Sequence, residues 1–281
     1  MSLNHDLWHV ARRLTLPARD FADDRETLDC LLDQGADINR TDSRRRDDGS
    51  VLAVGETDNS LHLLNIVAAS GDIDLFDHLV SRGADPSLST ALHAASKCKD
   101  PETSTAMIRH LLDKHNIDIN RDKDDLRHFI HDSQDKGSPL CSAILYRNLP
   151  VVHELLNRGA RVNDPNWSPV YYAAKADGFL PAMEPLLRAG ADATEALETS
   201  AATRNIDAAK ACLQYRPDPT PALRVAIDME ERRAYRVASD AEYDRKHAES
   251  GDEKSEEEVE EEKEEERQSQ AMVELLKSAS K

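Results

Sequence analysis

This 281-residue sequence contains few aromatic residues and no long apolar runs. Phe, Trp and Tyr together make up 4% of it, and apolar residues make up 39%, which is low for a compact globule. No apolar run approaches the roughly 20 residues that a membrane-spanning helix requires, and the mean hydropathy is −0.64. The opening residues MSLNHDLWHVARR lack the apolar core of a signal peptide. We therefore expect no membrane segment and a cytoplasmic protein, with the nucleus as a second location.

Cysteine is also scarce, and its spacing excludes the common structural metal sites. The four cysteines, at positions 30, 98, 141 and 212, form no CxxC pair and indicate reduced, buried thiols in an intracellular protein. The segment HFIHD at 128–132 contains two histidines, yet no further His or Cys completes a zinc set and no calcium-loop spacing is present. No nucleotide-binding or hydrolase motif occurs either. The sequence therefore predicts no metal, no cofactor and no catalytic residue.

The charge of the chain is strongly negative and unevenly distributed. The net charge is −18, and residues 240–281 hold 16 acidic against 7 basic side chains, so about half of the excess lies at this end. Such a charge argues against nucleic-acid binding, which requires a basic field. We expect 236–281 to form an acidic, low-complexity tail that is either helical or disordered. Its end, AMVELLKSAS, has apolar residues at helical spacing, and contact of the tail with its own chain is one expected interaction.

One phrase recurs four times along the chain. Its copies read LDCLLDQGADIN, LFDHLVSRGADPS, VVHELLNRGARVN and MEPLLRAGADAT, and a second short helix is predicted about 20 residues before each Gly-Ala. That helix opens with Ser or Thr as a cap, often with Pro in its first turn, where the missing N–H costs nothing. Glycine after the second helix adopts the left-handed conformation that closes it. The pattern predicts paired helices joined by tight turns.

These residues resemble the ankyrin repeat, in which T-P-L-H-x-A-A opens the first helix and L-L-x-x-G-A-x-x-N closes the second. TALHAA at 90–95 is nearly that opening, and residues 138–163 match the pattern without a gap. The resemblance extends over about residues 6–227. It implies an all-α, ankyrin-type helix-turn-helix solenoid, because stacked neighbours bury apolar faces that one repeat cannot bury alone. It also implies that His93 is structural and forms a hydrogen bond between repeats.

The resemblance divides the chain into an array at 1–235, followed by the tail at 236–281. The expected repeats are 6–39, 62–87, 90–120, 138–163, 168–194 and 195–220, with a closing helix at 221–235. Two connections, 40–61 and 121–137, are longer than the usual finger and are predicted to be inserted loops. The third and sixth repeats lack the closing Gly-Ala.

In the family, partners typically bind the concave face formed by the fingers and the inner helices. Aromatic side chains of the fourth and fifth repeats and a line of basic side chains are expected there. Exposed aromatics are good anchors, whereas the same rings packed between repeats would belong to the core. The predicted partner-binding residues are Arg12, Arg13, Lys97, Leu145, Tyr146, Arg147, Trp167, Tyr172 and Lys175. These residue types favour a partner protein that presents an acidic or apolar peptide.

The function favoured by these observations is a non-enzymatic protein–protein interaction or scaffold module. The alternative is a small-molecule-binding protein or an atypical enzyme that uses the groove and the two inserted loops, with His9, His128 or His131 as acid–base groups. Whether the chain is an enzyme stays open, because chemistry requires a site and no convergent constellation is visible in the sequence.

Overall fold

The computed structural model describes most of the chain as helices joined by short turns. The described residues are 6–7, 9–10, 22–39, 63–122, 137–164, 166–175, 177–246 and 255–281. All regular secondary structure within these ranges is helical, without a strand, which confirms the all-α prediction. The described residues also contain no helix that is long and apolar enough to cross a bilayer. The chain divides into two units, Met1–Ser168 and Pro169–Lys281.

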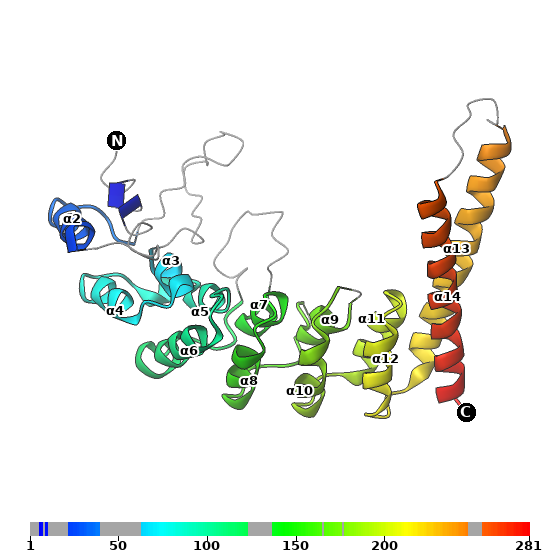
Figure 1. The fold of residues 1–281 in the computed structure, drawn as a ribbon. Helices are drawn as coiled ribbons and strands as arrows, with labels where there is room; N and C mark the ends of the chain where they lie inside the picture. Colours follow the sequence, from blue (N-terminus) through cyan, green and yellow to red (C-terminus); the bar gives the residue numbers. More distant parts are fainter. Residues whose placement is uncertain are drawn as a thin grey trace. The chain divides into compact units, whose positions relative to one another are not determined.

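The first unit consists of helix pairs that follow one another in chain order (Figure 1). In each pair a shorter inner helix precedes a longer outer helix, and α3 packs on α5, α5 on α7 and α6 on α8. The elements are α2 (Ala22–Asp33), α3 (Leu63–Ser70), α4 (Ile73–Ser81), the 3-10 helix η2 (Pro86–Leu88), α5 (Ala91–Ala95), α6 (Pro101–His115), α7 (Pro139–Leu145) and α8 (Leu149–Asn157).

The second unit continues the pairing and ends in two long helices (Figure 1). Its elements are α9 (Pro169–Ala174), the 3-10 helix η4 (Leu180–Ala182), α10 (Met183–Arg188), α11 (Ala193–Ala202), α12 (Ile206–Leu213), α13 (Pro219–Lys246) and α14 (Glu256–Ala279). Within this unit α9 packs on α11, α10 on α12, and α11 on α13. Buried Ala222 and Ala226 lie one turn apart on α13, and their small side chains allow close approach of the backbones.

The outer helices begin at polar side chains that cap them. Asp72 Oδ1 accepts a hydrogen bond from the backbone N–H of Leu75 at 2.9 Å, and Asp100 caps α6 in the same way. Asn148 and Asn205 cap α8 and α12. Each cap satisfies one of the backbone donors that an α-helix leaves unpaired at its N-terminus, which is why these helices begin at these residues.

Left-handed residues end the outer helices. Gly83 has φ +102°, and the N–H of Ala84 behind it donates to the carbonyl of Leu79 at 3.0 Å. The third and sixth repeats lack this glycine, and there Asn116 (φ +48°) and Arg216 (φ +53°) adopt the left-handed conformation instead. Because Asn tolerates this conformation better than most residues, α6 continues to His115 before it ends.

Two helices close the second unit at its C-terminal end. α13 runs through residue 236, where the sequence analysis placed the start of the tail. α14 is preceded by its N-cap Ser255, which forms a capping box with Glu258. α14 packs on α12 and α13 and buries Met272 and Leu276. This part of the acidic tail is therefore helical and contacts its own chain.

Candidate partner-binding site

Two predicted binding residues meet at the ends of the inner helices α5 and α7. The Nζ atom of Lys97, just beyond α5, lies 5.0 Å from the ring centroid of Tyr146, the C-cap of α7. This is the geometry of a cation–π contact. Tyr146 remains 43% exposed, and Arg147, the next residue, is also exposed. With the half-buried Leu145, these four residues form what we call the Tyr146 surface.

The Tyr146 surface is held by the turn from α7 to α8. Arg147 has φ +57°, at the position where Gly71 (φ +79°) stands in the turn from α3 to α4. Asn148 follows, buried, and its Nδ2 donates to the carbonyl of Ser96 at 3.4 Å and to Ser104 Oγ at 2.9 Å. Since Ser96 directly precedes Lys97, Asn148 ties the turn that carries Tyr146 to the turn that carries Lys97.

Trp167 lies at the other end of α7, so the predicted aromatic cluster does not form. The Cys141 thiol, in the first turn of α7, donates to the carbonyl oxygen of Trp167 at 3.3 Å. A Cβ atom added at Gly137 would come within 2.6 Å of the Trp167 Cβ, which shows how closely these segments approach. The seven residues of α7 separate its two ends by about 10 Å. Trp167 is half-buried and does not contribute to the Tyr146 surface.

Tyr172 was expected to face outward, and the structure shows that it is buried. It is only 7% exposed, whereas Tyr171 beside it is 48% exposed, and the two rings meet edge to face at 5.7 Å. The position itself explains the error: its equivalents Ala94 and Ser142 on the preceding inner helices are buried as well. Lys175, two residues beyond Ala173, is half-buried and pairs with Asp177 at 3.2 Å.

Other residues considered in the sequence fall outside the described ranges. These are Arg12, Arg13, His128 and His131, together with residues 40–61 and 123–136 of the two inserted loops. Their predicted roles stay predictions.

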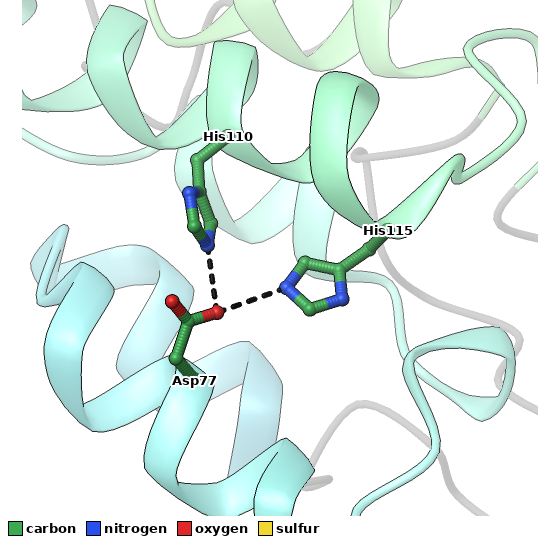
Figure 2. Close-up of side chains that lie close together, drawn as sticks. All are labelled: Asp77, His110 and His115. Carbon is green, nitrogen blue, oxygen red and sulfur yellow. Dashed lines mark hydrogen bonds and ion pairs between the residues drawn. The ribbon is translucent and has the colours of Figure 1, made fainter.

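A cluster of two histidines and an aspartate lies between α4 and α6 (Figure 2). Asp77 Oδ1 is 2.8 Å from His110 Nε2 and 3.1 Å from His115 Nε2, and Lys114 Nζ is 2.7 Å from Asp77 Oδ2. Burial raises the pKa of the Asp77 carboxyl, but hydrogen bonds from Lys114, His110 and His115 outweigh it and lower that pKa to about 2. Among the described residues, this is the group of His, Cys, Asp and Glu side chains that could hold a metal ion.

The sequence analysis missed this cluster because its residues come from different repeats. His110 and His115 are five residues apart in the chain, and Asp77 stands 33 residues before His110. The spacing of His110 and His115 fits the histidine half of a zinc-finger pattern, but no CxxC pair accompanies it, and Asp77 is too distant in the chain to belong to such a motif. The histidine at 115 was a further signal, because the first, second, fourth and fifth repeats have glycine at this position.

The comparison with protein families agrees with the helix pairs of the first unit. The family described as ankyrin repeats matches residues 63–166 in three copies. This segment contains the pairs α3/α4, α5/α6 and α7/α8. The search of the curated proteins found no match. Ankyrin repeats are typically protein–protein interaction modules. Residues 63–166 of this chain are ankyrin repeats.

Proposed function

We propose that the chain is a non-enzymatic binding or scaffold module that holds a partner protein at the Tyr146 surface. The observation that supports this site is the contact of Lys97 Nζ with an aromatic ring that stays 43% exposed. Tyrosine and arginine are the residue types that dominate the energetics of protein interfaces. Here Tyr146 and Arg147 are adjacent and both exposed, on a turn that Asn148 connects to Ser104 through a hydrogen bond of 2.9 Å.

The partner that fits this surface presents an acidic segment with an apolar side chain. Lys97 and Arg147 supply two cations beside Tyr146, in a protein whose net charge is −18. An acidic segment would form charge-assisted hydrogen bonds with these cations, while the Tyr146 ring offers area for an apolar contact. Because the net charge of the protein is negative, an acidic partner would be repelled from the rest of the surface, which favours this local site.

The location that we propose is intracellular, in the cytoplasm or the nucleus. All four cysteines are free thiols, and Cys141 and Cys212 are buried. Free thiols are the usual state of cysteine in a reducing compartment, which supports this proposal.

The site is tested with variants that keep the local backbone. Tyr146→Ala removes the ring, and Arg147→Gly removes a cation at a left-handed position where glycine is unstrained. Each tagged full-length variant is used for crosslinked affinity capture from native cell extract, beside the unchanged protein. We expect at least about tenfold less of the captured partner with the double variant, because it loses two anchors of the interface.

Two control variants carry the same chemical changes elsewhere. Arg216→Gly replaces an exposed arginine with φ +53°, and Tyr235→Ala replaces a tyrosine that is 78% exposed on α13. Both are expected to capture the partner as the unchanged protein does. If all the variants capture the same proteins in the same amounts, or if the controls lose the partner equally, the Tyr146 surface is not the binding site.

A further inference from the structure

A carboxylate–imidazole contact recurs between the outer helices of successive repeats. His78 Nε2 on α4 lies 2.9 Å from Asp29 Oδ1 on α2, and His110 Nε2 on α6 lies 2.8 Å from Asp77 Oδ1 on α4. The two histidines are equivalent, because each opens one of the aligned segments HLVSRG and HLLDKH. The shared contact is therefore part of how these repeats stack, and it needs no ligand to explain it.

Between α4 and α6, a second imidazole also contacts the aspartate. The equivalent contact between α2 and α4 involves the single imidazole of His78. The alignment places His115 at the position of Gly83. His115 stays in α6 because the left-handed residue has moved to Asn116. The His115 side chain is only 9% exposed. Its imidazole points toward Asp77, and its Nε2 lies 3.1 Å from Asp77 Oδ1 (Figure 2). One carboxylate oxygen thus faces two imidazole nitrogens from a single helix.

We propose that Asp77, His110 and His115 bind a transition-metal dication of the zinc class. All three donor atoms lie within 4.8 Å of one another. A tetrahedral ion at about 2.0–2.2 Å from each donor would separate the donors by about 3.4 Å. The observed separations of 2.8 and 3.1 Å from Asp77 Oδ1 fall just below that value, so small side-chain movements admit the ion.

The donor set selects the class of metal. Two imidazole nitrogens and one carboxylate oxygen suit Zn²⁺ and its neighbours, whereas Ca²⁺ and Mg²⁺ prefer sets made of oxygen alone. Three protein ligands leave at least one coordination position for water. Since Asp77 belongs to α4 and both histidines belong to α6, the ion would clamp two successive repeats together.

Lys114 is the natural competitor for this ion. Its Nζ lies 2.7 Å from Asp77 Oδ2, and its side chain is 57% exposed, so it is free to withdraw into solvent. In the metal-free protein the ammonium group balances the carboxylate. When an ion binds, the two positive charges repel each other, and the metal affinity is lower than the three ligands alone would provide.

The experiment measures Zn²⁺ binding to the full-length chain after treatment with a chelator. Titration calorimetry with ZnCl₂ gives the affinity, and the Co²⁺ absorption spectrum reports the coordination geometry. We expect one ion per chain, with a tetrahedral Co²⁺ spectrum. His115→Gln should weaken this binding by at least about tenfold, because even the loss of a group that only supports a metal ligand typically has an effect of about that size.

Two further variants make the result decisive. His78→Gln alters the equivalent contact outside the cluster and should leave Zn²⁺ affinity unchanged. Lys114→Met removes the competing ammonium and should tighten binding, which loss of folding could not mimic. The proposal is overturned if the unchanged protein shows no site, or if His115→Gln binds Zn²⁺ as tightly as the unchanged protein. It is also overturned if His78→Gln weakens binding as much as His115→Gln does.

Discussion

His93 and Cys141 stand at the same position of successive repeats and make the same contact with different chemistry. His93 Nε2 lies 3.0 Å from the carbonyl oxygen of Gly137, and the Cys141 thiol donates to that of Trp167 at 3.3 Å. Burial raises the pKa of the Cys141 thiol to about 12, so it stays protonated and can donate at neutral pH. The contact between repeats that the resemblance implied for His93 is confirmed. The sequence also showed that the position tolerates exchange, because cysteine and histidine both occupy it.

Glu154 makes a pH-dependent contribution to the stability of the first unit. Its side chain is 12% exposed and accepts hydrogen bonds from Arg109 at 2.8 and 2.9 Å and from Arg158 at 2.6 Å. The bonds from Arg109 and Arg158 lower the pKa of the Glu154 carboxyl below 4.5 despite its burial. A lowered pKa means that this stabilisation is present above pH 4.5 and is lost as the pH falls through the folded-state value. Glu154→Gln should therefore lower the free energy of unfolding by about 1–2 kcal/mol at pH 7, and by less at acidic pH.

Urea unfolding at neutral and acidic pH measures this difference. The matched control is Glu184→Gln, which breaks an exposed pair between Glu184 and Arg188. Because exposed pairs contribute about 0–1 kcal/mol, this control should change stability little at either pH. A deficit for Glu154→Gln that is the same at both pH values would contradict the ion-pair explanation.

Asn148 shows at the level of elements how one helix cap also joins two repeats. Its Oδ1 accepts from the N–H of Val151, and its Nδ2 reaches Ser96 and Ser104 in the preceding repeat. Asn205 repeats this arrangement in the second unit, where it caps α12 and donates to the carbonyls of α9 and its following turn. The sequence analysis expected Ser and Thr caps on the inner helices and did not name these two asparagines. Their partners in another repeat were not predictable either, because they depend on how the pairs stack.

Asn148→Ala is expected to cost more than the removal of a simple cap. Loss of the cap alone costs about 1 kcal/mol, and the buried groups left without a partner add about 1–3 kcal/mol. Asp72→Ala is the comparison, because Asp72 caps α4 through the N–H of Leu75 and is less buried than Asn148. Urea unfolding of both variants gives the two losses. Equal losses would mean that the bonds from Asn148 to the preceding repeat contribute nothing to stability.

At the scale of the whole molecule, α14 lies in the acidic C-terminal segment and covers the helices α12 and α13. α14 buries Ser269, Met272 and Leu276 along one face, and Arg236 on α13 pairs with Glu265 at 2.8 Å. The opposite face of α14 keeps its acidic residues exposed. Capping elements of repeat arrays have this form, with an apolar inner face and a polar outer face.

Leu276→Ala tests this cover. The side chain is fully buried, so the substitution should lower the free energy of unfolding by about 2–4 kcal/mol and raise amide exchange in α12 and α13. Leu275→Ala makes the same chemical change at a half-buried neighbour and should have a smaller effect on both. Hydrogen exchange of the full-length protein provides the measurement. If both variants behave alike, the burial of Leu276 does not stabilise the end of the array.

The sequence by itself determined that the chain is all helical and contains ankyrin repeats, which the family match places at residues 63–166. First-turn prolines and closing glycines act within one turn of the chain, so the sequence pattern was sufficient to predict them. The expectation of Ser and Thr caps on the inner helices was wrong for Thr90 and Ser138, whose side chains make no capping hydrogen bond, whereas side-chain caps are present on the outer helices α4 and α6. The sequence also predicted that Lys97 and Tyr146 belong to a binding surface, a role that the proposed experiment tests.

Only the tertiary structure decided which side chains from different repeats meet. It placed Tyr146 and Trp167 at opposite ends of α7, buried Tyr172, and brought Asp77 against two histidines of the next repeat. These outcomes depend on how neighbouring helices rotate and stack. That stacking is set by the packing of many apolar side chains together, so no single residue or spacing encodes it.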